Sequence, residues 1–97
     1  MVKHMIIWKY KDGVDPAETG KKIKAALEGL VGKIDGLIKM EIVIDKLSSS
    51  SGDLMMDSTF ESEAALMAYQ SHPLHLEAAN GLVRPNVDVR LSLDYEV

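Results

Sequence analysis

The chain has 97 residues, enough for one domain spanning residues 1–97 and too few for a second. With 46% hydrophobic and 27% charged residues and no cysteine, the composition excludes a disordered chain, a disulfide scaffold, a thiolate metal site and a cysteine nucleophile. The net charge of −4, with no basic block, argues against nucleic acid as a partner. The chain shows neither the roughly 20-residue apolar run of a membrane span nor a signal-peptide pattern, so we expect a cytoplasmic protein with no membrane partner.

The first half of the chain predicts a strand, a helix and a second strand. Residues 2–10 alternate in a β-branched and aromatic pattern, with apolar side chains on both faces, which predicts a central strand. Asp15 is placed to cap a helix whose first residue is Pro16, and apolar residues at helical spacing continue to a stop at Gly32. A second strand is predicted from about Leu37 to Lys46.

The second half predicts a mobile loop, two further strands and an interrupted helix. Residues 47–52 form a polar loop with four consecutive serines, and residues 48–52 are expected to be the most mobile internal segment. A strand follows over residues 53–60. Ser62 is a candidate cap for a helix that breaks at His72-Pro73. Pro73 begins another turn that Asn80-Gly81 closes, and a strand with one apolar and one polar face follows over residues 87–97.

The resulting order β-α-β-β-α-β predicts an α+β, ferredoxin-like domain, with two helices on one face of a four-stranded antiparallel sheet. Nothing in so short a chain is left to cover the other face. Met5, Ile7 and Val43 nevertheless give that face an apolar character. An uncovered apolar face indicates a partner, and we expect a homodimer that packs sheet against sheet.

The sequence carries no phosphate-binding glycine loop, dinucleotide fingerprint, zinc-protease motif or serine-nucleophile motif. The remaining chemical candidates are polar residues in apolar surroundings, namely His4, Tyr69, His72, His75 and Asp94. Two interpretations of His4 stay open. It is either a core histidine bonded to backbone or a general acid/base that lines a cavity.

Tyr69, His72 and His75 are spaced three residues apart around the proline break. The two histidines are only a weak indication of a metal site, because no carboxylate stands at ligand spacing. We expect His72 to be structural, at the cap before Pro73, and His75 to face a cavity beside the Tyr69 hydroxyl. There a tyrosine would donate a hydrogen bond to a carbonyl group while a histidine removes a proton. The alternative is a His75 that is solvent-exposed or bonded to backbone with no cavity nearby.

Almost the whole chain resembles the stress-responsive α/β-barrel domain family, also called Dabb. The resemblance rests on the Val2-Lys3-His4 start, the segments 8–12, 32–36 and 58–62, the Tyr69-Gln70-Ser71-His72-Pro73-Leu74-His75 motif, Val83-Arg84-Pro85 and the Asp94-Tyr95-Glu96-Val97 end. It implies a homodimer whose two sheets form a barrel with the helices outside.

The family includes plant stress proteins without an assigned reaction and plant polyketide cyclases, which close a polyketide by an aldol step. The resemblance to these cyclases implies that Tyr69, His75 and His4 line the pocket. It also implies that Asp94, on the last strand, steadies the histidine.

Three functional interpretations stay open at this point. The chain is a cofactor-free enzyme or ligand-binding domain for a small organic molecule, a non-catalytic dimeric stress or accessory protein, or a cofactor-independent monooxygenase-like barrel. A cavity of about 300 Å³ or more that exposes His75 and Tyr69 would favour small-molecule chemistry, and a filled core would favour a structural role.

Overall fold

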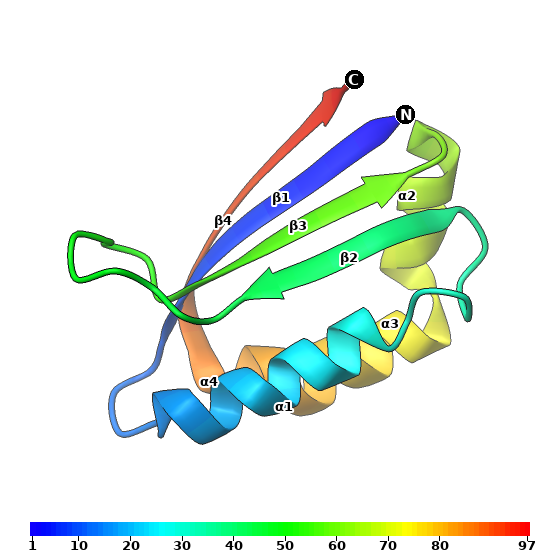
Figure 1. Ribbon diagram of the computed structural model, residues 1–97. Helices are drawn as coiled ribbons and strands as arrows, with labels where there is room; N and C mark the ends of the chain where they lie inside the picture. The colour runs from blue at the N-terminus through cyan, green and yellow to red at the C-terminus, as the bar shows by residue number, and fades with distance from the viewer.

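The computed structural model describes all residues 1–97 and confirms the ferredoxin-like βαββαβ fold. Four antiparallel strands form one sheet in the order β2-β3-β1-β4, and every helix lies on one face of it (Figure 1). The elements are β1 (Val2–Tyr10), α1 (Pro16–Glu28), β2 (Leu37–Val43), β3 (Leu54–Phe60), α2 (Glu63–Ser71), α3 (Pro73–Ala78), the π-helical turn η1 (Ala79–Val83), α4 (Arg84–Asn86) and β4 (Val87–Glu96). None of the helices has both the length and the apolar character needed to cross a membrane.

The predicted strand β1 is central, between β3 and β4. Its alternate residues Val2, His4, Ile6 and Trp8 are buried against the helical layer. His4 therefore lies opposite Ser58 on one neighbouring strand and Asp94 on the other. Because opposed residues in a ladder share a face, this register places polar side chains from three strands on the helix side of the sheet.

Helix α1 begins as predicted but ends earlier. The Asp15 side chain accepts a hydrogen bond from the Glu18 N–H at 3.2 Å, and Pro16 occupies the first helical position. The predicted end at Gly32 is wrong, because the helix ends at Glu28. After it, hydrogen bonds join residues three apart, such as the Leu30 N–H to the Leu27 carbonyl at 3.1 Å, which tightens the last turn.

Strand β2 also ends before its predicted boundary. It stops pairing with β3 at Val43 rather than Lys46, and β3 begins at Leu54. The Asp53 carboxylate accepts hydrogen bonds from the Tyr10 N–H at 2.9 Å and the Lys46 ammonium at 2.7 Å, which ties the loop ends instead of extending the ladder. The loop projects beyond the sheet (Figure 1), and its mobility stays a prediction.

The second helical segment breaks at His72, as predicted, but Asn80-Gly81 does not close it. The chain continues through η1 and α4 to Asn86. Gly81 does not adopt the positive φ of a helix-stopping glycine, so the helical path is not interrupted there. The π-helical turn instead keeps Ala79 and Val83 both buried, and it contacts α1.

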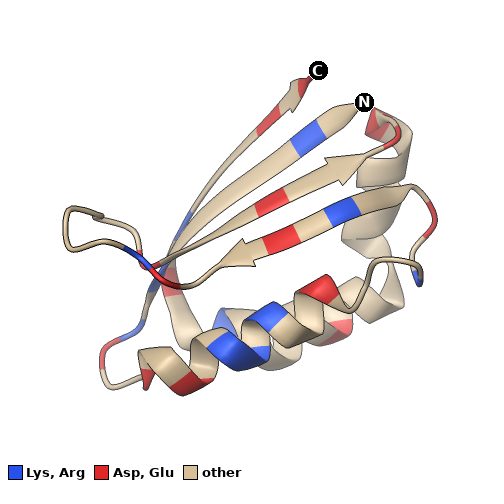
Figure 2. Ribbon diagram, in the orientation of Figure 1, with Lys and Arg blue, Asp and Glu red and all other residues tan.

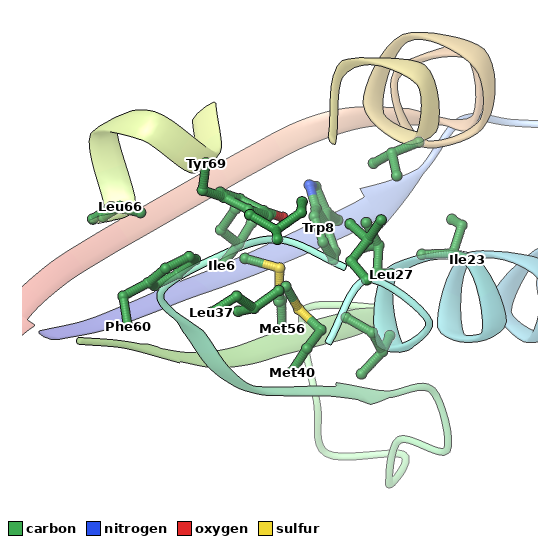
Figure 3. Close-up of a cluster of buried hydrophobic side chains, with 14 of the residues drawn as sticks. Ile6, Trp8, Ile23, Leu27, Leu37, Met40, Met56, Phe60, Leu66 and Tyr69 are labelled. Carbon is green, nitrogen blue, oxygen red and sulfur yellow. The ribbon is translucent and has the colours of Figure 1, made fainter. Parts of the chain in front are cut away.

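The two faces of the sheet differ in what covers them. The helix side holds one continuous core of buried side chains (Figure 3), whereas no helix covers the opposite side. We call this uncovered side the outer face. Its exposed apolar residues are Ile7, Val43, Val89, Leu91, Leu93 and Tyr95. Acidic and basic residues are interspersed over both layers (Figure 2).

Candidate active site

A cavity of about 80 Å³ lies between the sheet and the second helical segment. Its inner wall is apolar, and Ile6, Trp8, Leu27 and Met56 supply it from β1, α1 and β3. Figure 3 shows Tyr69 of α2 close to Ile6 and Trp8. The polar residues of the wall are His4, Tyr69, Gln70, His75, Arg84 and Arg90. The cavity therefore brings together residues from both ends of the chain.

The break at His72-Pro73 places Tyr69 and His75 in contact. Tyr69 lies in the last turns of α2 and His75 in the first turn of α3, and their ring centroids are 4.2 Å apart with planes inclined by 39°. His72 itself accepts a hydrogen bond from the Leu74 N–H at 3.1 Å through Nδ1, and it is not part of the cavity wall. His72 thus caps α3, while the turn after it presents His75 to Tyr69.

The His75 ring is held in one tautomer. Its Nδ1 lies 3.2 Å from the Gln70 carbonyl oxygen, and because a carbonyl only accepts, Nδ1 carries the hydrogen. Burial, the largest effect, lowers the pKa of His75, while the hydrogen bond to Gln70 raises it. The positive charges of Arg84 and Arg90 are among the further causes that lower it. His75 is thus a neutral imidazole near pH 7, with a lone pair on Nε2.

Tyr69 has the complementary character of a donor. It is 1% exposed, and burial raises its pKa far above the ordinary value, so the hydroxyl stays protonated. The Tyr10 hydroxyl is the one fully enclosed side-chain polar atom without a partner. The Tyr69 hydroxyl also has no partner in the chain, but it is not among the fully enclosed atoms. Because Tyr69 lines the cavity, its hydroxyl can donate a hydrogen bond to a molecule there.

His4 and Asp94 form a second polar pair. His4 Nδ1 bonds to the Asp94 carboxylate across the β1–β4 ladder, and the His4 side chain is 3% exposed. Asp94 lies on the opposite face of β4 from Leu91 and Leu93, and the register of β1 with β4 sets it beside His4. Asp94 therefore orients His4, and the structure shows no contact between Asp94 and His75.

Three polar wall residues, Gln70, Arg84 and Arg90, were absent from the sequence-based candidates. Arg90 could have been found, since it lies on the same face of the last strand as Asp94. Arg84 could not, because its position depends on the helical path that continues through Gly81. Gln70 binds His75 through its backbone carbonyl, and a backbone contact cannot be recognised from the type of residue in the sequence.

The cavity is smaller than the roughly 300 Å³ that favours a drug-sized ligand. A volume of about 80 Å³ suits a molecule of a few non-hydrogen atoms better than a long chain. The core is nevertheless not filled at the point where Tyr69 and His75 meet.

The chain is similar to several known proteins along its whole length. It is 29% identical over 102 residues to the stress-response A/B barrel domain-containing protein HS1 of Arabidopsis thaliana, covering 98% of this chain and 88% of that protein. A dimeric protein of unknown function with a ferredoxin-like fold from Bacteroides fragilis is 25% identical with a TM-score of 0.89, over 99% of this chain and 95% of that one.

A crystallised Arabidopsis thaliana protein is 28% identical with a TM-score of 0.84, over 100% of this chain and 95% of that one. The family model of the stress responsive A/B barrel domain matches residues 2–97. The chain therefore belongs to the stress responsive A/B barrel domain family, Dabb.

Proposed function

We propose that this chain is a cofactor-free acid-base catalyst that acts on a small carbonyl compound in the cavity between the sheet and α2–α4. His75 is the general base, Tyr69 is the hydrogen-bond donor to the carbonyl oxygen, and His4, oriented by Asp94, completes the polar wall. The observation that carries the proposal is the contact of the His75 and Tyr69 rings, 4.2 Å between centroids, in the wall of a cavity whose inner side is apolar.

The reaction step follows from the protonation states. The lone pair on His75 Nε2 takes a proton from the carbon next to the carbonyl group. The electrons of that C–H bond form the carbon–carbon double bond of an enolate, and the negative charge moves to the carbonyl oxygen. The Tyr69 hydroxyl stabilises this oxygen by donating a hydrogen bond in a site that excludes most water. The imidazolium then returns its proton to carbon or to a leaving group.

The volume of the cavity supports a small substrate. About 80 Å³ suits a carbonyl compound of a few non-hydrogen atoms and not the long chain handled by polyketide cyclases. The proposal therefore keeps the general acid-base chemistry that the family resemblance implies and reduces the size of the substrate.

We also propose that the chain works as a homodimer through its outer face. The Bacteroides fragilis protein of the same fold is dimeric. Leu91 and Leu93 on the outer face are 69% and 67% exposed in the single chain, which is unusual for leucines on a regular strand. A standard interface would bury about 1,200–2,000 Å² in total.

Hydrogen–deuterium exchange tests the catalytic proposal. Acetone in D₂O is followed by proton NMR with the wild type, His75→Ala, Tyr69→Phe and the matched control His72→Ala. We expect catalysed exchange that falls by about 10²-fold or more without His75, by about tenfold or more in Tyr69→Phe, and stays unchanged in the control. If the wild type and His75→Ala exchange acetone equally, the catalytic proposal is wrong and a non-catalytic accessory role is favoured.

Sedimentation tests the dimer. Analytical ultracentrifugation at micromolar concentration should give a dimer for the wild type and a monomer for Leu91→Glu. Met67→Glu, an equally exposed apolar position on α2, should leave the dimer intact. A monomeric wild type would contradict the proposed interface.

A further inference from the structure

The charged residues of the cavity wall are all of one sign. Of the thirteen residues that line the cavity, Arg84 and Arg90 carry full positive charges and none is an aspartate or glutamate. Both arginines line the same cavity as His75 and Tyr69, the proposed reacting groups. Because a cavity with charges of one sign raises the local concentration of the opposite ion, the wall favours an anionic ligand.

The two arginines are not neutralised by the chain. Arg84 donates a hydrogen bond to the Asn80 side-chain oxygen, a neutral group, and neither arginine belongs to any of the five ion pairs of the structure. Of the acids on β4, Asp94 is already bonded to His4, and neither Asp88 nor Glu96 forms an ion pair with either arginine. Their guanidinium groups therefore keep free donors, which match the oxygen atoms of a carboxylate.

The cavity wall changes from apolar in the interior to positively charged at the mouth. The inner residues Ile6, Trp8, Leu27 and Met56 are at most 4% exposed. Arg84 and Arg90 are exposed residues, so the positive charge lies at the mouth. Tyr69 and His75 also line the wall of this cavity. A matching ligand has a short apolar end, a carbonyl group and a terminal anionic group.

We infer that the substrate is a short-chain oxo acid, whose carboxylate is bound by Arg84 and Arg90 at the mouth while its carbonyl group meets Tyr69 and His75. This inference rests on the proposed function, since it names the substrate class of the same site. The carboxylate orients the substrate so that its alkyl end enters the apolar interior, where His75 removes the proton. Arg84 and Arg90 are specificity-determining residues in this scheme.

The test compares pyruvate with pyruvamide, a neutral compound that has the same number of non-hydrogen atoms. Binding is followed through the NMR signals of the His75 ring, and methyl exchange in D₂O is followed in the same samples. We expect pyruvate to bind about five- to tenfold more tightly than pyruvamide at low salt, and this preference to shrink at high salt. Arg84→Gln and Arg90→Gln should each weaken pyruvate binding more than pyruvamide binding and so reduce the preference, whereas Lys22→Gln on α1 should leave the preference as it is in the wild type.

The outcomes separate this inference from the proposed function. Equal binding of the two probes by the wild type, or an equal loss of both probes in the arginine variants, overturns the inference even if His75-dependent exchange persists. A pyruvate preference that depends on the arginines supports the inference even if no exchange occurs, and in that case the catalytic proposal fails instead. Displacement of pyruvate by inorganic phosphate at a lower concentration than by acetate would contradict a carboxylate and identify a phosphate-bearing ligand.

Discussion

The two halves of the helical layer treat their polar groups differently. On α1, Lys24 and Glu28 bond to each other at 2.7 Å, and together they bind both backbone groups of Ile42 on the edge strand β2, at 2.7 and 2.9 Å. On the α2–α4 side, the Tyr69 hydroxyl has no partner in the chain and the two arginines of the cavity lack an acid. The α1 pair fastens its helix to the sheet, whereas the Tyr69 hydroxyl and the charges of Arg84 and Arg90 have no such partner.

The backbone shows the same contrast. Helix α1 is one uninterrupted run with a capped start, whereas the second segment changes course at His72 and again at the π-helical turn. Breaks and π-turns cost stability and occur often at functional sites. The difference indicates that stability is concentrated on α1 and chemistry on α2–α4, and the following predictions test that division.

Truncation of the α1 core should give the largest effect. Ile23 is fully buried, so Ile23→Ala leaves a cavity and should lower the free energy of unfolding by about 2–5 kcal/mol. Urea denaturation measures the loss. Met67→Ala, at a site 66% exposed on α2, should remain within about 0.5 kcal/mol of the wild type. Similar losses in both variants would contradict the tight packing of Ile23 in the core.

Acid should act on the other half first. Burial lowers the pKa of His75 below its ordinary value of 6.5, so the unfolded chain takes up a proton at a higher pH than the folded chain. This contribution to stability is complete above about pH 6.5 and is lost as the pH falls below it. Catalysed exchange should stay constant down to a midpoint below 6.5 and then fall about tenfold per pH unit.

Arg90→Gln provides the control for this pH profile. Because the Arg90 charge helps to lower the pKa of His75, its removal should move the midpoint of exchange to higher pH. A midpoint at or above 6.5 in the wild type would be inconsistent with a buried, neutral His75.

Loss of the α1 fastening should have a moderate effect. Glu28→Gln weakens the hydrogen bond from the Ile42 N–H and removes the charge that pairs with Lys24, which should cost about 1 kcal/mol at pH 7. The hydrogen bond from Ile42 is the largest cause that lowers the pKa of Glu28. Its contribution is therefore present above about pH 4.5 and is lost as the pH falls through the lowered pKa.

The difference between wild type and Glu28→Gln should accordingly shrink in acid, measured by urea denaturation at several pH values. Glu18→Gln is the matched control, because Glu18 pairs with Lys22 on the exposed side of the same helix. A pH-independent difference for Glu28→Gln would show that the charge of Glu28 is not what fastens β2.

The division also explains what the sequence could predict. Period-two alternation in β1 and β4 is a local signal, and it predicted how the residues of these strands divide between the two faces of the sheet. It does not carry the register that turns the polar face of β4 toward the helices and sets Asp94 opposite His4. The end of α1 was missed because the chain after Glu28 continues in turns with hydrogen bonds between residues three apart. Leu30 therefore keeps the spacing from the other apolar residues that a continuing helix would give it. Arg84 was missed because Asn80-Gly81 is a usual stop, whereas the helical path continues past it with Ala79 and Val83 buried on either side.

Tyr69→Phe should have the smallest effect on stability and still be informative. The Tyr69 ring is packed against Phe60, with centroids 4.9 Å apart, and phenylalanine keeps that contact. The hydroxyl bonds to no group of the chain, so its removal breaks no hydrogen bond and should change the free energy of unfolding by less than about 0.5 kcal/mol.

Carbonyl exchange should nevertheless fall in the same variant, because the donor to the enolate oxygen is lost. A structural hydroxyl would give the reverse pattern. If urea denaturation shows a loss of 1 kcal/mol or more while exchange is unchanged, the hydroxyl serves the fold, and the free polar groups of the α2–α4 half need another explanation. Ser58→Ala is the comparison, because the Ser58 hydroxyl donates to the His4 carbonyl at 2.6 Å in the core, and its loss should lower stability measurably.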